Sequence, residues 1–145
     1  MRDRKINSTR FLSKVSACAV AGVFLLASLP AFAQPHVIEV LADKDSRYKI
    51  SGQKAGQVVV KTGETIVLRI DARKGKSWNR DGTIHGFTLL HMKSRAKVAG
   101  WDLELKPGVQ EFTLTAPEPG EYEVVCTVIC SDDHEGMRMK LLVLP

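Results

Sequence analysis

Short runs of alternating apolar and polar residues, separated by glycine and proline turns, continue from residue 34 to the end of this chain. Alternation with a period of two is typical of strands that bury one face, whereas a helix repeats its apolar residues every three or four positions. Turn chemistry supports the division, since Pro107-Gly108 and Pro117–Gly120 combine a fixed φ angle with a residue that tolerates positive φ. The pattern predicts seven or eight strands, over residues 36–41, 48–50, 57–61, 64–71, 85–90, 110–115, 121–126 and 137–144.

Short strands with regular turns indicate an all-β fold, either a Greek-key β-sandwich or a barrel. A chain of 145 residues has room for one domain with one sizeable core. We therefore expect one domain over residues 34–145 and no helix within it. Trp101 is expected to pack in the core or at its rim rather than to serve as a port for electrons.

Residues 1–33 have the order of a secretory signal. A cationic start precedes an apolar run over residues 17–29, which Pro30 and the small-residue pattern 31–33 follow. The segment predicts a signal helix cleaved before Gln34, and hence a periplasmic protein. The alternative is an uncleaved membrane anchor over residues 15–33, a stretch just long enough to span a bilayer.

The net charge of +5 belongs mainly to this leader. Residues 1–33 hold five cations and one acid, whereas the remaining chain holds 16 cations and 15 acids. A nearly neutral body gives no reason to expect binding to nucleic acid. Basic runs over residues 73–80 and 93–97 are expected to be solvated loops, with a docking patch for an acidic partner as the alternative.

The segment from Cys126 to Met137 holds four soft or borderline metal ligands, with Cys130 and His134 between them, at the spacing C-x3-C-x3-H-x2-M. Thiolate, imidazole and thioether together favour copper over hard cations such as magnesium or calcium. Zinc also binds thiolates, but a thioether is a poor ligand for it. The third cysteine, Cys18, leaves with the leader.

A further imidazole is needed, and three are available, on His36, His85 and His91. His36 lies at the start of the mature chain, where order is least expected. His85 and His91 would lie roughly 20 Å apart on one extended strand, so only one of them can join the site. If that strand is antiparallel to residues 121–126, His85 lies at the Cys126 end, and we expect His85 to be the ligand.

Two simpler interpretations of the cysteines stay open. Export exposes thiols to an oxidising compartment, where Cys126 and Cys130 could form a disulfide. A disulfide has no use for His134 and Met137 at these positions. A mononuclear type 1 copper site could use His85, one cysteine, His134 and Met137, although it leaves the second cysteine unexplained.

The four-ligand motif, together with His85-Gly86-Phe87 upstream, resembles the CuA domain of cytochrome c oxidase subunit II and of nitrous oxide reductase. The resemblance covers roughly residues 55–145. It implies a cupredoxin fold that holds two copper ions bridged by the two cysteine sulfurs. It further implies that each copper is capped by one imidazole, from His85 and His134. Met137 and the backbone carbonyl of Val128 would be weak ligands, and the pair would carry one electron.

The chain departs from these families in three respects. Subunit II has a glutamate at the position of Val128, whose side chain serves a magnesium site, so that role is absent here. Subunit II also has two transmembrane helices and an aromatic-rich stretch for electron entry, and nitrous oxide reductase has a large propeller domain. The sequence therefore favours a free-standing CuA-like domain.

Three functions follow from this interpretation. The first is a periplasmic electron carrier, not an enzyme, between partners such as a c-type cytochrome and a terminal oxidase or reductase. The second is a copper-binding chaperone that delivers copper to another enzyme. The third is a detached subunit II-like part of a cytochrome c oxidase. Contact with the membrane is expected only if the leader is uncleaved.

Overall fold

The computed structural model of the protein describes residues 34–52, 56–76 and 79–145. The signal helix predicted over residues 1–33 lies outside these ranges. Within the described ranges, no helix is long and apolar enough to cross a membrane.

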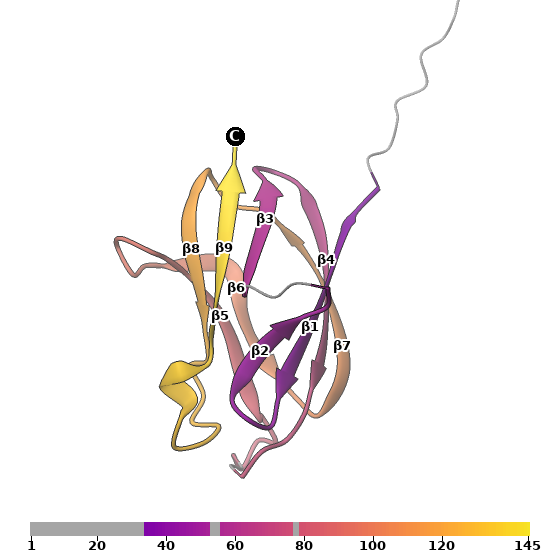
Figure 1. The fold of residues 1–145 in the computed structure, drawn as a ribbon, viewed down its shortest axis with the longest axis vertical. Coiled ribbons are helices and arrows are strands. Elements are labelled where there is room, and N and C mark those ends of the chain that lie inside the picture. The colour runs from indigo at the N-terminus through magenta and orange to yellow at the C-terminus, as the bar shows by residue number, and fades with distance from the viewer. Residues whose placement is uncertain (1–33, 53–55, 77–78) are drawn as a thin grey trace, which may run out of the picture. The chain divides into compact units, whose positions relative to one another are not determined.

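The described chain forms nine strands in two sheets, shown in Figure 1. The four-stranded sheet has the order β2-β1-β4-β7, and the five-stranded sheet has the order β3-β9-β8-β5-β6. The prediction of an all-β fold is thereby confirmed, and the two sheets correspond to the β-sandwich rather than the barrel. The strands are β1 (His36–Asp43), β2 (Arg47–Ile50), β3 (Gln57–Lys61), β4 (Thr65–Ala72), β5 (His85–His91), β6 (Lys97–Leu105), β7 (Gly108–Thr115), β8 (Gly120–Val125) and β9 (Arg138–Leu144).

Two of the strand pairs are parallel, although an alternating pattern is more typical of antiparallel strands. β1 pairs with β4 in parallel, and β3 pairs with β9 in parallel. In both pairs the chain visits the other sheet between the two strands, and such a crossing allows parallel neighbours where a tight hairpin does not. The remaining strand pairs are antiparallel.

Strand β6 was not predicted from the sequence. It lies at the edge of the five-stranded sheet, and only Trp101 and Leu105 are buried along its nine residues. Gly100 has φ of +79°, and the pairing register between β5 and β6 shifts between Thr88 and Leu90. A bulge of this kind breaks the period of two on which the prediction depended.

The core lies between the two sheets and is built from one face of most strands. Along β4 the buried positions alternate, with Ile66, Leu68 and Ile70 inward as predicted. β5 differs, because every residue from His85 to Leu89 is buried. Trp101 is 4% exposed and its indole Nε1 donates to the carbonyl of Thr115 at 3.0 Å, so it packs as expected.

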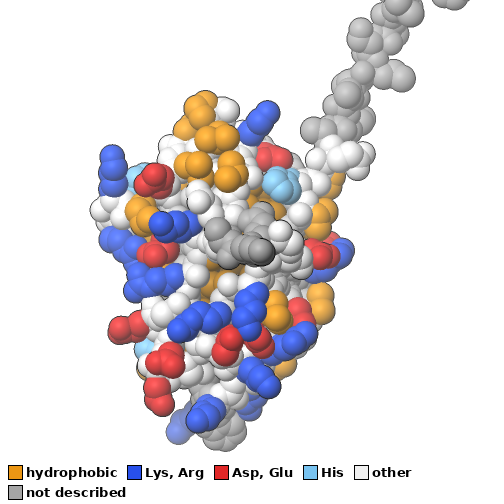
Figure 2. Space-filling view, in the orientation of Figure 1, with side chains coloured by type: hydrophobic (Ala, Val, Ile, Leu, Met, Phe, Trp, Pro, Cys, Tyr) orange, Lys and Arg blue, Asp and Glu red, His pale blue; other side chains and the backbone are white. Residues whose placement is uncertain are grey.

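Charges of both signs interleave on the face of the molecule shown in Figure 2. Several surface ion pairs join neighbouring strands. Arg69 on β4, for example, lies 3.3 Å from Glu39 on β1 and 3.1 Å from Glu111 on β7. Pairs this exposed contribute little stability each, so the packing between the sheets carries most of it.

Candidate metal centre

The segment between β8 and β9, residues 126–137, is called the ligand loop below. Cys126 follows the last residue of β8, and Met137 precedes the first residue of β9. The backbone N–H of Cys126 donates to the carbonyl of Met137 at 3.2 Å, which continues the ladder between the two strands by one more pair. In Figure 1 the loop projects from the end of the sheet opposite the C-terminus. Both outer ligands of the motif are therefore fixed by the sheet itself.

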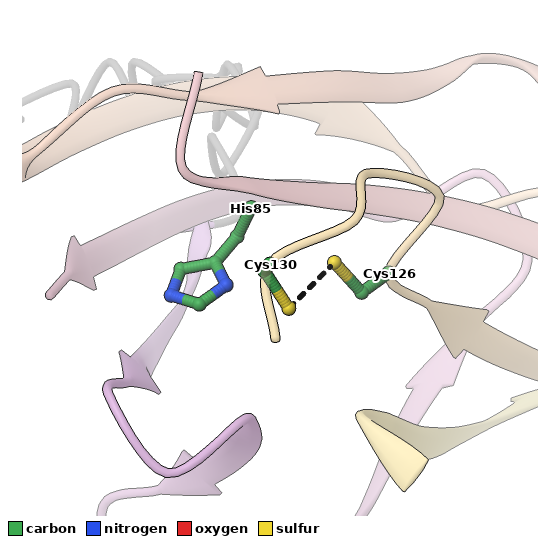
Figure 3. A group of neighbouring side chains, drawn as sticks. All are labelled: His85, Cys126 and Cys130. Carbon is green, nitrogen blue, oxygen red and sulfur yellow. Dashed lines mark hydrogen bonds between the residues drawn. The ribbon is translucent and has the colours of Figure 1, made fainter. Parts of the chain in front are cut away.

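Strand polarity brings His85 to this loop. β5 is antiparallel to β8, with Thr88 opposite Val125 and His91 opposite Tyr122. The expected polarity is confirmed, and it puts His85 at the Cys126 end of the strand and His91 at the other end. The ligand atoms of His85, Cys126 and Cys130 all lie within 4.8 Å of one another. Figure 3 shows these three side chains grouped together.

The two cysteines are free thiols whose sulfur atoms lie 3.5 Å apart. A disulfide bond requires about 2.05 Å, so the pair is close without being bonded. Cys126 is 7% exposed and Cys130 is fully buried. Both side chains belong to the buried core of the protein.

Each sulfur has a further potential ligand beside it. The carbonyl oxygen of Val128 lies 3.1 Å from Cys126 Sγ, and the thioether sulfur of Met137 lies 3.8 Å from Cys130 Sγ. Met137 is fully buried. The weak donors thus accompany different cysteines.

The two ring nitrogens of His85 have different surroundings. Its Nε2 lies 3.0 Å from the carbonyl of Arg73, to which it donates in the tautomer that this contact favours. Its Nδ1 is buried and has no hydrogen-bond partner. A buried nitrogen without a partner is costly unless something else binds it, and metal-bound histidines usually donate their second nitrogen to a carbonyl in this way.

Gly86 stabilises the first sulfur through its backbone. Its N–H donates to Cys126 Sγ at 3.3 Å, and its carbonyl accepts from the hydroxyl of Tyr48 on β2. A side chain at this position would collide with the ligand loop, because a Cβ on Gly86 would lie 2.9 Å from the backbone nitrogen of Thr127. The close approach of β5 to the loop therefore requires glycine.

The two cysteines have very different pKa values. The hydrogen bond from Cys130 lowers the pKa of Cys126 to about 6, and the N–H of Gly86 contributes to this shift. The same contact with Cys126, together with burial, raises the pKa of Cys130 to about 12. At neutral pH the pair therefore holds one proton and one negative charge, and a thiolate is the form of cysteine that binds metals.

His134 is not brought into this group. It begins the short 3-10 turn η1 (His134–Gly136), and its ring is half-buried. Its Nδ1 lies 3.1 Å from the carbonyl of Ser131, within the loop itself. The group whose ligand atoms lie within 4.8 Å of one another consists of His85, Cys126 and Cys130 and does not include His134.

The other two histidines have different surroundings. His36 forms an ion pair with Glu64 at 3.2 Å. His91 packs its ring edge against Tyr122, with a centroid distance of 5.2 Å. Neither of them lies in the group formed by His85 and the two cysteines.

Residues outside the motif also contact the centre. Ser46, Tyr48 and the carbonyl of Arg73 belong to the four-stranded sheet or to the segment that leaves it, and all three contact His85, Gly86 or Cys130. No sequence spacing links these residues to the cysteines; Ser46 and Cys130, for example, are 84 positions apart. The signal that could have drawn attention to Tyr48 was its inward position in a predicted strand.

No protein-family model matches the chain, and no curated protein matches it in sequence. Its fold is nevertheless similar to solved structures. One is a chain of a heme-copper terminal oxidase dimer, with 19% identity and a TM-score of 0.53 over 75% of this chain. Another is auracyanin A, a "blue" copper protein from Chloroflexus aurantiacus, with 18% identity and a TM-score of 0.54 over 77% of this chain and 100% of that one.

A third similar structure is reduced rusticyanin, with 19% identity and a TM-score of 0.50 over 74% of this chain and 78% of that one. The protein spans 65% of the length of the oxidase chain. At these identities the likeness shows the fold. The chain has the cupredoxin fold.

The donor set of the centre fits copper. Two buried sulfurs, a thioether and an imidazole nitrogen without a partner are soft or borderline ligands, and they lie close together in this structure. Of the six predicted ligands, the structure brings together Cys126, Cys130, His85, Met137 and the carbonyl of Val128, and leaves His134 aside.

Proposed function

We propose that this protein is an electron carrier whose ligand loop and His85 hold a binuclear copper centre of the CuA type. The observation that carries the proposal is the pair of free cysteine sulfurs 3.5 Å apart, with the unpartnered Nδ1 of His85 beside them. Copper bound there would gain and lose one electron. The ligands in this proposal are His85, Cys126, Val128 through its carbonyl, Cys130, His134 and Met137.

The arrangement of the weak donors favours two copper ions over one. A single type 1 copper needs one thiolate and one weak axial ligand. Here the Val128 carbonyl accompanies Cys126 and the Met137 thioether accompanies Cys130, so each sulfur has its own weak donor. A mononuclear site would leave one such pair without a role.

The surroundings of the centre suit electron transfer. His85, Cys130 and Met137 are buried, and the two ends of the ligand loop are anchored to adjacent strands of one sheet. Side chains held in this way change position little when the charge at the centre changes, which keeps the reorganisation that accompanies each electron small. Exclusion of water strengthens the hydrogen bond from Gly86 to Cys126.

One edge of the centre is close to the surface. Ile129, between the two cysteines in the loop, is 70% exposed. An apolar side chain so near the sulfurs offers a partner a short route to the centre. We propose that the leader exports the protein to the periplasm, and that its partners are redox proteins such as a c-type cytochrome or a terminal oxidase.

Copper delivery is the second candidate, and the third is service as a detached subunit II-like part of a terminal oxidase. Delivery to another protein needs ligands that a receiving site can reach. The burial of His85, Cys130 and Met137 argues against it, whereas the half-buried position of His134 is the feature that favours it. The rate at which copper leaves the protein separates these functions.

The test begins with copper loading of the purified domain, followed by absorption and EPR spectra. An electron shared by two copper nuclei gives a purple protein with a seven-line hyperfine pattern, whereas a single copper gives a blue protein with four lines. His85→Ala is expected to abolish or alter the spectrum. His91→Ala is the matched control, because His91 lies on the same strand but at its other end.

A four-line spectrum would contradict the binuclear centre and leave a mononuclear one. Loss of copper to a chelator within seconds would favour delivery over electron transfer. A spectrum that responds to His91→Ala and not to His85→Ala would contradict the ligand set.

A further inference from the structure

Ser46 has an unusual position for a serine. It lies in the turn between β1 and β2, in the four-stranded sheet, where its N–H donates to the carbonyl of Asp43 at 3.1 Å. It is 1% exposed and its φ is +57°. A non-glycine residue in the left-handed region is uncommon and costs free energy, and glycine would avoid that cost. Something other than the turn itself must favour a serine here.

The hydroxyl of Ser46 points at the ligand loop of the other sheet. Its Oγ lies 2.5 Å from the hydroxyl oxygen of Ser131 and 3.7 Å from the sulfur of Cys130. Arg47, the first residue of β2, also lies against the loop, since a Cβ on Gly136 would lie 3.0 Å from its Nη1. Ser46 and Arg47 therefore approach the loop on both sides of His134.

A count of hydrogens fixes the direction of these bonds when Cys130 is a thiolate. A thiolate has no hydrogen and can only accept, so the hydrogen between Ser46 and Cys130 must come from Ser46. The short contact between the two hydroxyls must then use the hydrogen of Ser131. Ser131 Oγ in turn accepts the backbone N–H of Asp133 at 3.1 Å. The result is a chain of donors that begins at Asp133 and ends on the sulfur of Cys130.

We propose that Ser46 is a positioning residue that donates its hydroxyl hydrogen to Cys130 and thereby raises the reduction potential of copper bound to that sulfur. This inference rests on the copper centre proposed above. A hydrogen bond to an ionised acceptor is stronger than one between neutral groups, and it strengthens as negative charge on the acceptor increases. The sulfur carries more negative charge when the centre is reduced. The hydroxyl therefore stabilises the reduced form more than the oxidised form.

Ser46 complements the donor on the other sulfur. Cys126 accepts from the N–H of Gly86 at 3.3 Å, a bond from within the five-stranded sheet. Cys130 receives its donor from the opposite sheet, through a side chain. A backbone donor survives substitution of most side chains, whereas the donor from Ser46 is removed by changing one residue. Ser46 is thus the position at which the potential of this centre can be set independently of its ligands.

The experiment measures the reduction potential of the copper-loaded protein in Ser46→Ala and Ser46→Gly. Both variants lack the hydroxyl, but glycine also relieves the left-handed backbone, so the two differ in stability. We expect both to lower the equilibrium constant for reduction by the same factor, about three- to tenfold, which corresponds to a potential about 30 to 60 mV lower. Ser51→Ala, at an exposed serine just beyond β2, is the matched control and should leave the potential unchanged.

A vibrational measurement tests the bond directly. Exchange into deuterated water should shift the copper–sulfur stretching frequency of the wild-type protein, and the shift should be smaller in Ser46→Gly, where one exchangeable donor is missing. Ser131→Ala retains the hydroxyl of Ser46 and removes only the group that donates to it. It should lower the potential by less than either Ser46 variant, and it keeps the test available if the Ser46 variants fold poorly.

The outcomes separate the two proposals. If the wild-type protein shows no copper–thiolate absorption, the proposed function is wrong and this inference is wrong with it. If the wild-type protein shows the expected spectrum while both Ser46 variants keep its potential and its deuterium shift, only the inference is wrong. A change in melting temperature without a change in potential would likewise reduce Ser46 to a structural brace.

Discussion

Replacement of Gly86 by alanine tests how closely β5 must approach the ligand loop. The added Cβ would lie 2.6 Å from Oγ1 of Thr127, 2.9 Å from its backbone nitrogen and 3.4 Å from Cγ2 of Val128. The hydroxyl of Thr127 cannot easily turn aside, because it lies 2.9 Å from the hydroxyl of Thr88. The backbone nitrogen cannot move without moving the loop. Since Gly86 does not have a positive φ, the effect is a steric one alone.

Overpacking of a well-ordered interior usually costs about 1–3 kcal/mol, and contacts below 3.0 Å to backbone put Gly86→Ala in the upper part of that range. For a domain of about 100 residues each kcal/mol lowers the melting temperature by roughly 4–8 °C, so a loss of about 2–3 kcal/mol corresponds to a fall of roughly 8–24 °C. Because Thr127 follows Cys126 directly, the displaced loop should also disturb the sulfur positions.

The assay is urea unfolding of the reduced, copper-free protein, followed by copper loading and absorption spectroscopy. Gly56→Ala is the matched control, since its Cβ would meet only Cβ of Met139, at 4.0 Å. Gly86→Ala/Thr127→Ala should recover part of the loss, because it removes the hydroxyl but not the backbone nitrogen. If the free energy of unfolding of Gly86→Ala lies within about 0.5 kcal/mol of that of the control, and the variant loads copper normally, the close approach of β5 to the loop does not affect stability and the reasoning is refuted.

Three further predictions concern charge and the surface. Arg95 and Arg138 lower the pKa of Glu123, so Glu123→Gln should reduce the free energy of unfolding by about 1 kcal/mol at neutral pH. Urea unfolding of both proteins at several pH values should show this difference vanish as pH falls through the lowered pKa of Glu123. The pKa of Cys126 in the reduced, copper-free protein is about 6, so ultraviolet thiolate absorbance should rise as pH increases through that value. The contribution of this thiolate to the free energy of unfolding should be lost as pH falls through the same value. A midpoint of the absorbance change near pH 8.5, about the value of an ordinary cysteine, would contradict the lowered pKa. Ile129→Glu should leave the copper spectrum unchanged but slow electron transfer from a c-type cytochrome at least tenfold in stopped-flow measurements. The reason is that a charge would replace the exposed apolar side chain between the cysteines. An unchanged rate would mean that the partner docks elsewhere on the protein.

The strands and most of the centre could be predicted from local patterns. Alternation identified eight of the nine strands in the described part of the chain, and the antiparallel relation of β5 to β8 was sufficient to choose His85 over His91. β6 could not be identified, because the bulge near Gly100 interrupts its period. The parallel pairs β1–β4 and β3–β9 depend on crossings between the sheets, which a local pattern does not encode.

Two aspects of the centre lay beyond sequence reasoning for physical reasons. The spacing places His134 within reach of the cysteines, but the direction of its ring depends on the 3-10 turn and on the carbonyl of Ser131. The contact of Ser46 with Cys130 depends on how two sheets stack, and the residues are 84 positions apart. The copper ligands themselves remain predictions that the loading experiment tests.

The proposed ligands and several of the groups that contact the centre come from different sheets, and this has a consequence for protein engineering. Every proposed ligand comes from β5 or from the loop that joins β8 to β9, both in the five-stranded sheet, whereas Ser46, Tyr48 and the Arg73 carbonyl approach the centre from the other side of the core. A ligand loop transplanted from another copper protein would bring its own metal preference but would meet the hydroxyls and carbonyl already present here. Chimeras made in this way should have the absorption spectrum of the protein that supplies the loop, but a reduction potential close to that of the protein that receives it.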